Sequence, residues 1–288
     1  MSRLFEALQR SNAGRFGAPL SALPTMAAGV VEAKETPGND FEQLSPVPVT
    51  ISPSAQLVTL ASPESLGAEK FRLLAVRITH LQKTRNFKRL LITSTMAEEG
   101  KSLVAANLSV ALARRTHRKV LLLEGDLRRP SQAQMFGLAT LPGLSEWLQS
   151  ETSDPATVYH MKEAGMWLIP AGIPPENPTE LMQSKKLPAL LDQMNNWFDW
   201  VVIDSPPVLP IADTSLWMRL TEGILLVARE GKTERRQLKR GLEGIGTASL
   251  VGVVINDCTT TSTSNYYQRY CLPAHRPNGD AQVRKATQ

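Results

Sequence analysis

The chain has 288 residues, of which 42% are hydrophobic and 20% charged, a composition that supports one large or two small globular domains. Its formal net charge of +5 permits weak attraction to anionic lipid or nucleic acid without requiring either, and we expect no specific nucleic-acid partner. The two cysteines, Cys258 and Cys271, exclude a disulfide framework, and the sequence has neither a secretory signal nor an apolar run long enough to span a membrane. These features favour a cytoplasmic protein.

Residues 1–61 are predicted to precede the folded domain. Within them, residues 1–13 have the pattern of a short amphipathic helix, which is either a docking peptide or a frayed terminal helix. Residues 14–56 are rich in Pro, Gly, Ala and Ser without periodicity, which predicts a largely disordered linker.

Residues 62–257 alternate between short apolar runs and longer amphipathic segments. The runs expected to form strands are 89–93, 120–123, 167–170, 200–203, 223–228 and 250–255. The segments expected to form helices are 64–81, 103–115, 178–197, 213–220 and 233–245. Alternation of this kind is typical of βαβ crossovers, so we expect an α/β fold with a doubly wound, mostly parallel sheet.

A phosphate-binding loop is predicted after the first strand. Residues 94–102 read STMAEEGKS and precede a helix, so backbone amides and the helix N-terminus would cradle phosphates. Lys101 would reach the terminal phosphates of ATP, and the Ser102 hydroxyl would bind Mg²⁺. The other nucleotide-binding candidates here are Thr95, Glu99, Gly100 and Leu103. Thr95 stands where such loops usually have glycine, and the adjacent Glu98 and Glu99 require side chains that point to solvent.

Carboxylates follow two further predicted strands. Glu124 and Asp126 come after the second, and Asp204 ends the run VVID. Each alone is equally a helix cap or a salt-bridge partner, but a parallel sheet gathers the carboxyl ends of its strands where ligands bind. We expect Asp126 and Asp204 to lie beside a Mg²⁺ shared with ATP, which would supply the positive charge that buried carboxylates need. Asn256, at the end of the last strand, is either a strand-end cap or an adenine contact.

Three of the four tyrosines lie close together in the polar segment 258–288. Tyr266, Tyr267 and Tyr270 form either a strand that docks on a neighbouring surface or a cluster of phosphate acceptors. Phosphorylation would add roughly −1.5 to −2 charges at each tyrosine and reverse the basic character of this segment.

Together these motifs resemble the bacterial tyrosine kinases of capsule and exopolysaccharide biosynthesis over residues 62–272. The specific sequences are EGDLRRP at 124–130 and VVIDSPP at 201–207, with the GKS loop and the tyrosine-rich segment. The resemblance implies a deviant P-loop fold like that of partition ATPases, use of ATP and Mg²⁺, and phosphorylation of C-terminal tyrosines between neighbouring subunits. It gives Lys101 and Ser102 the role of the P-loop pair that binds phosphates and Mg²⁺, and Asp126 and Asp204 those of metal and catalytic carboxylates. On this reading Glu124 or Asp204 would accept the proton of the tyrosine hydroxyl.

The resemblance also implies partners. Such kinases act with a membrane polysaccharide co-polymerase that activates them, which would place the protein at the inner face of the membrane, and with a cognate tyrosine phosphatase. The family's interface helix carries Glu, Arg and Arg at intervals of three, and this chain has Glu69 and Arg72 but Ala75 in the third position. Two alternatives remain: an ATP-driven switch of the partition or septum-placing type, and a nucleotide-binding adaptor without kinase activity.

Overall fold

The computed structural model describes residues 47–49, 56–116, 118–151, 157–247 and 249–258. The predicted helix at 1–13, most of the predicted linker, and Tyr266, Tyr267 and Tyr270 lie outside the described residues. No helix in the described ranges has the length and apolar content needed to cross a bilayer.

A seven-stranded sheet in the order β3-β4-β2-β5-β1-β6-β7 forms the centre of the described domain. Its strands are β1 (Arg89–Ser94), β2 (Val120–Glu124), β3 (Tyr159–Met161), β4 (Met166–Ile169), β5 (Trp200–Asp204), β6 (Gly223–Arg229) and β7 (Leu250–Asn256). All neighbours pair in parallel except β3 and β4. The expected doubly wound, mostly parallel sheet is confirmed, and the antiparallel edge strand β3 is an addition to it.

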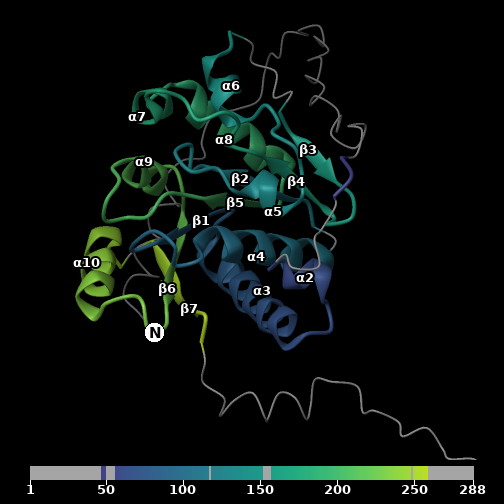
Figure 1. The fold of residues 1–288 in the computed structure, drawn as a ribbon, viewed down its shortest axis with the longest axis vertical. Coiled ribbons are helices and arrows are strands. Elements are labelled where there is room, and N and C mark those ends of the chain that lie inside the picture. Colours follow the sequence, from purple (N-terminus) through teal and green to yellow (C-terminus); the bar gives the residue numbers. More distant parts are fainter. Residues whose placement is uncertain (1–46, 50–55, 117, 152–156, 248, 259–288) are drawn as a thin grey trace, which may run out of the picture. The chain divides into compact units, whose positions relative to one another are not determined.

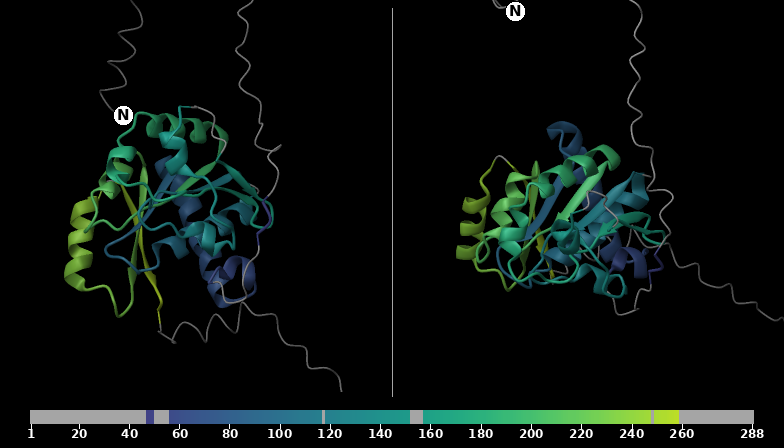
Figure 2. Two further views of the ribbon diagram at one scale, coloured as in Figure 1. Left: turned by 45° about the horizontal axis from the view of Figure 1, so that its top comes forward. Right: turned by 90° about the horizontal axis from the view of Figure 1, so that it is seen from above.

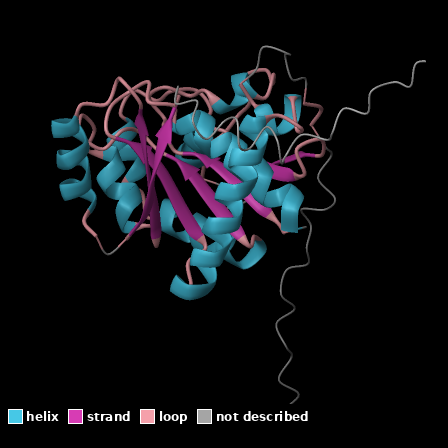
Figure 3. Cartoon of the chain, turned by 90° about the horizontal axis from the view of Figure 1, so that it is seen from below, coloured by secondary structure: helices cyan, strands magenta, loops and turns pink. Residues whose placement is uncertain are grey.

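Helices cover both faces of this sheet (Figures 1 and 3). The helices are α2 (Val58–Ala61), α3 (Leu66–Arg85), α4 (Lys101–Thr116), α5 (Gln132–Met135), α6 (Leu144–Gln149), α7 (Pro178–Met182), α8 (Lys186–Trp197), α9 (Asp213–Arg219) and α10 (Arg235–Ile245). Along β1, Leu90 and Ile92 point to the side of α3 and α4, whereas Leu91 points to the side of α6 to α9. This alternation explains why the strands read as continuous apolar runs, since both faces are buried.

The helix predicted at 178–197 is two helices, α7 and α8. The cause is Pro188. In the middle of a helix a proline has no backbone N–H to donate, and its ring clashes with the carbonyl group four residues earlier. A new helix that begins at Lys186 places this proline in its first turn, where no intrahelical donor is needed. Figure 2 shows the same helices from two further directions.

The domain core includes residues earlier than the predicted boundary at 62. Leu57 is 1% exposed and belongs to the core on the α3 and α4 side. In α2, the backbone amide and the hydroxyl of Thr59 both donate to Oδ1 of Asn107 in α4, over 3.1 and 2.9 Å. The packed domain therefore includes the last residues of the segment 1–61, which was predicted to precede it.

Candidate functional site

The loop between β1 and α4 brings a left-handed turn to the N-terminus of a helix. Gly100 has φ +91°, and a Cβ atom at this position would lie 2.1 Å from Nδ2 of Asn256, so only glycine fits. α4 begins at Lys101, and the amides of its first turn have no carbonyl partners within the helix. These amides, together with the helix dipole, form an anion-binding position.

Glu99 does not point to solvent, contrary to the sequence expectation, whereas Glu98 does. The Glu99 carboxylate is buried and accepts hydrogen bonds from the backbone amides of Thr95 and Met96 over 2.7 and 3.0 Å, and from the Thr233 hydroxyl. Burial is tolerated because these donors replace water around the charge. Glu98 pairs with Lys232 over 2.6 Å at the surface. Hydrogen bonds between Glu99 and Thr95 thus stabilise the conformation of the phosphate loop.

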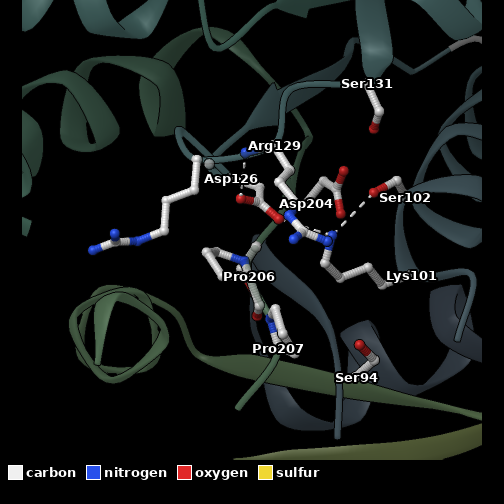
Figure 4. Close-up of polar contacts among 12 residues, drawn as sticks. Ser94, Lys101, Ser102, Asp126, Arg129, Ser131, Asp204, Pro206 and Pro207 are labelled. Carbon is white, nitrogen blue, oxygen red and sulfur yellow. Dashed lines mark hydrogen bonds and ion pairs between the residues drawn. The ribbon is translucent and has the colours of Figure 1, made fainter. Parts of the chain in front are cut away.

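Lys101 lies against the carboxylates that follow β2 and β5 (Figure 4). Its Nζ is 3.0 Å from Oδ2 of Asp126 and 3.2 Å from the Ser102 hydroxyl. Burial alone would lower the pKa of Lys101, but the charges of Asp204 and Asp126 outweigh it and raise that pKa. The ammonium group is therefore held charged where the terminal phosphates of a nucleotide would lie.

Asp204 is fully buried at the end of β5, and β5 pairs with both β1 and β2. Its Oδ2 accepts a hydrogen bond from Nε2 of Gln132 over 2.8 Å, whereas its Oδ1 has no hydrogen-bond partner. Burial raises the pKa of this carboxyl, against the lowering effect of Lys101. An unpartnered buried carboxylate oxygen beside a serine hydroxyl fits the hard oxygen donors that Mg²⁺ prefers, directly or through water.

Glu124 has a different environment. Its Oε1 accepts hydrogen bonds from the backbone amides of Ser131 and Gln132, and its Oε2 accepts one from Ala171 over 3.0 Å. Burial raises the pKa of Glu124 to about 7, although these three amides lower it. With its oxygens so engaged, Glu124 joins β2, α5 and the end of β4, whereas one oxygen of Asp204 has no hydrogen-bond partner.

The two arginines of the RRP motif diverge. Arg128 Nε donates to Oδ2 of the buried Asp213 over 2.7 Å and so ties the loop after β2 to α9. Arg129 is exposed, and within the described residues its guanidinium makes no hydrogen bond or ion pair. Arg129 is therefore free to contact a ligand.

A cleft of about 1340 Å³ lies next to the phosphate loop and the start of α4. Lys101, Ser102, Asp126 and Asn256 line it, and the cleft continues along α3 and β7. Asn256 Nδ2 donates to the carbonyl oxygen of Glu99 over 3.1 Å, so this side chain joins β7 to the phosphate loop. The volume exceeds the space that one drug-sized ligand needs, which leaves room for a second group beside a nucleotide.

A strand, a glycine turn and a helix N-terminus with a buried lysine and two carboxylates define a nucleotide site of the P-loop class. The ParA family model described as "NUBPL iron-transfer P-loop NTPase" matches residues 87–270. Tyrosine-protein kinase YwqD of Bacillus subtilis (strain 168) is 32% identical over 212 residues, 73% of this chain and 89% of that protein.

Two further similarities agree. The crystal structure of the chimerical protein CapA2B2 matches with a TM-score of 0.67 and 29% identity, covering 77% of this chain and 98% of that one. The succinoglycan biosynthesis transport protein ExoP of Rhizobium meliloti (strain 1021) is 29% identical over 214 residues, 73% of this chain and 27% of ExoP. The chain belongs to the ParA-type P-loop NTPases and, among them, to the bacterial tyrosine kinases, which confirms the resemblance seen in its motifs.

Two site residues were not found from the sequence. Gln132 bridges Asp204 and the carbonyl oxygen of Ser102, and Thr233 holds Glu99 from the loop before α10. Gln132 follows the RRP motif by two positions, and this proximity is the one signal that could have drawn attention to it.

Proposed function

We propose that the chain is a protein-tyrosine kinase that uses Mg-ATP to phosphorylate its own Tyr266, Tyr267 and Tyr270 and thereby regulates exopolysaccharide or capsule synthesis and export. The observation that carries this proposal is the charged Lys101 between Asp126 and Asp204, with one oxygen of Asp204 unpartnered. Family membership adds the activity class, and ExoP adds the polysaccharide context.

The side chains of the site divide the proposed reaction among them, and Asp204 contributes to both metal binding and proton transfer. Lys101 and the amides at the start of α4 bind the terminal phosphates and balance the charge that develops on them. Ser102, Asp126 and Asp204 would hold Mg²⁺, which would draw charge from the phosphate oxygens. Asn256, at the cleft wall, is the candidate contact for the adenine base.

The transfer step needs an acceptor for the tyrosine proton, because a free tyrosine hydroxyl has a pKa of about 10. The tyrosine oxygen forms a bond to the γ-phosphorus, the bond from that phosphorus to the bridging oxygen breaks, and ADP leaves. The Asp204 carboxylate takes the tyrosine proton, since burial raises the pKa of this carboxyl and one of its oxygens makes no hydrogen bond in the structure.

The proposal extends to partners and location. A membrane polysaccharide co-polymerase would activate the kinase and hold it at the inner face of the membrane, and a tyrosine phosphatase would reset it. Contact between copies would use α3, where Glu69 and Arg72 form an ion pair with each other. Ala75, which stands where the family has a second arginine, carries no charge for such a contact and is buried rather than exposed.

Mass spectrometry of Tyr266, Tyr267 and Tyr270 after incubation with Mg-ATP tests the proposal, with and without the cytoplasmic segment of a candidate co-polymerase. Lys101→Met is the matched control. We expect phosphate on these tyrosines in the wild type and none in the variant. Nucleotide binding without phosphotyrosine under both conditions would refute kinase activity, and phosphate release would then separate the ATP-driven switch from the adaptor.

A further inference from the structure

The outer face of α10 is strongly basic. Arg236, Lys239 and Arg240 are exposed on it, and Arg235 lies at its flank. The opposite face packs inward, where Gly241 lies against the Thr95 side chain of the phosphate loop. The only ion pair that the described residues give these cations is the 3.8 Å approach of Lys239 to Glu243. Folding therefore leaves most of this positive charge without a partner.

The placement of these charges costs helix stability. Arg235 and Arg236 are the first two residues of α10, and the acidic side chain at this end is that of the N-cap residue, Glu234, which precedes them. Cations are unfavourable at the positive end of the helix dipole, whereas an anion bound there is stabilised. A basic face that begins at a helix N-terminus is thus suited to an anionic partner.

The C-terminal segment leaves the domain beside α10. Asp257, one residue beyond β7, pairs with Arg229 at the end of β6 over 2.7 Å. The backbone amide of Thr233 closes a turn onto the Arg229 carbonyl oxygen over 2.9 Å, and α10 begins two residues later. Tyr266 is nine residues beyond Asp257, a stretch of chain that reaches up to ~30 Å when extended. The tyrosines can therefore reach the first turns of α10.

The charge of this segment depends on its tyrosines. Residues 258–288 carry four basic side chains and one acidic side chain, so the unmodified segment is repelled by a basic helix. Three phosphates would each add roughly −1.5 to −2 charges and make the segment acidic. We propose that Arg236, Lys239 and Arg240 of α10 bind the chain's own C-terminal segment once Tyr266, Tyr267 and Tyr270 carry phosphate. The inference rests on the proposed kinase function only for the source of that phosphate.

A synthetic peptide tests this binding without any kinase activity. A fluorescein-labelled peptide of residues 262–272, with serine in place of Cys271, is prepared with phosphate on all three tyrosines and without phosphate. Its fluorescence anisotropy is followed while the full chain is added in the absence of ATP. The same titration uses Arg236→Gln/Lys239→Gln/Arg240→Gln, and a control with Lys83→Gln/Lys162→Gln/Lys185→Gln, which removes three exposed charges elsewhere.

We expect the phosphorylated peptide to bind the wild type at least about tenfold more tightly than the unmodified peptide, with affinity falling as salt rises. The α10 variant should lose this preference and the control should keep it. The proposal is overturned if the wild type does not distinguish the two peptides, or if both variants lose affinity equally. It is also overturned if α10 binds vesicles of phosphatidylcholine with about 30% phosphatidylserine but not the phosphopeptide, since the face would then be a lipid-binding surface. If the triple variant does not fold, Arg240→Gln alone should weaken phosphopeptide binding.

Discussion

Nε2 of Gln132 donates to Oδ2 of Asp204 over 2.8 Å and to the carbonyl oxygen of Ser102 over 3.0 Å. The amide thus fixes the orientation of the buried carboxylate relative to the start of α4. It also stabilises the charged form of Asp204, so it opposes the rise in pKa that burial causes. Gln132 contacts the proposed proton acceptor and is a positioning residue for it.

Gln132→Leu should raise the pKa of Asp204 further, because the carboxylate loses the side-chain donor that Gln132 provides. We expect the rate of tyrosine phosphorylation at neutral pH to fall roughly tenfold. A loss of this size corresponds to the energy of one hydrogen bond to a charged group. The acidic limb of the pH–rate profile should move to higher pH, so that activity recovers in part as pH rises. ATP affinity should change little.

Gln134→Leu is the matched control, since Gln134 is exposed in the same short helix and the chemical change is identical. A profile for Gln132→Leu that is lowered at every pH without a shift of its acidic limb would contradict this role.

Thr233→Val should loosen the phosphate loop. The Thr233 hydroxyl donates to Oε1 of Glu99 and accepts from the backbone amide of Arg229 over 2.7 Å. Its loss leaves a buried carboxylate with one donor fewer, which we expect to cost about 1–2 kcal/mol of unfolding free energy and to weaken ATP binding. Urea denaturation and titration calorimetry with Mg-ATP measure these effects. Thr233→Ser keeps the hydroxyl and should resemble the wild type, and a valine variant as stable as the serine variant would refute the link.

The sheet was predictable from the sequence because its central strands are buried on both faces. β1, β2, β5 and β6 therefore appear as apolar runs whose limits agree with the predicted ones to within one residue. β3 gives no such signal, because it has three residues and pairs with β4 alone at the edge of the sheet. Its existence depends on the sheet rather than on its own composition.

The residues of the candidate site that could be predicted are those that carry a charge or belong to the glycine-containing phosphate loop. Lys101, Ser102, Asp126 and Asp204 follow from a motif and from carboxylates at strand ends. The orientation of Glu99 does not follow, because one of its donors, Thr233, lies 134 positions away in the sequence. Gln132 was missed because a neutral amide at the start of a short helix has no distinctive pattern until β2 and β5 are known to be neighbours.

Glu124 should make stability depend on pH. Burial raises its pKa in the folded state from 4.5 to about 7, so between these values the folded chain binds a proton that the unfolded chain releases. This contribution, up to about 3 kcal/mol, is fully present below the unfolded pKa and is lost as pH rises through about 7. Glu124→Gln does not titrate, so its unfolding free energy should fall less than that of the wild type between about pH 5 and 8.

Urea denaturation of both proteins at several pH values measures the difference. Glu176→Gln, which changes an exposed glutamate, should follow the wild type. Parallel pH dependences in the wild type and Glu124→Gln would show that Glu124 does not titrate in this range.

Gly125→Ala should destabilise the fold by about 1–3 kcal/mol through overpacking. A Cβ atom at Gly125 would lie 2.6 Å from Cε2 and Cζ2 of Trp217, a fully buried side chain whose Nε1 donates to the Gly125 carbonyl oxygen over 3.1 Å. Gly244→Ala is the control, because its nearest contact, Val208 Cγ1 at 3.5 Å, is an ordinary one and alanine favours a helix. Trp217→Phe removes the crowded atoms. In a double-mutant cycle, Gly125→Ala should therefore lower the unfolding free energy less in the Trp217→Phe background than in the wild type. Strictly additive effects would show that the strain does not arise from contact with Trp217.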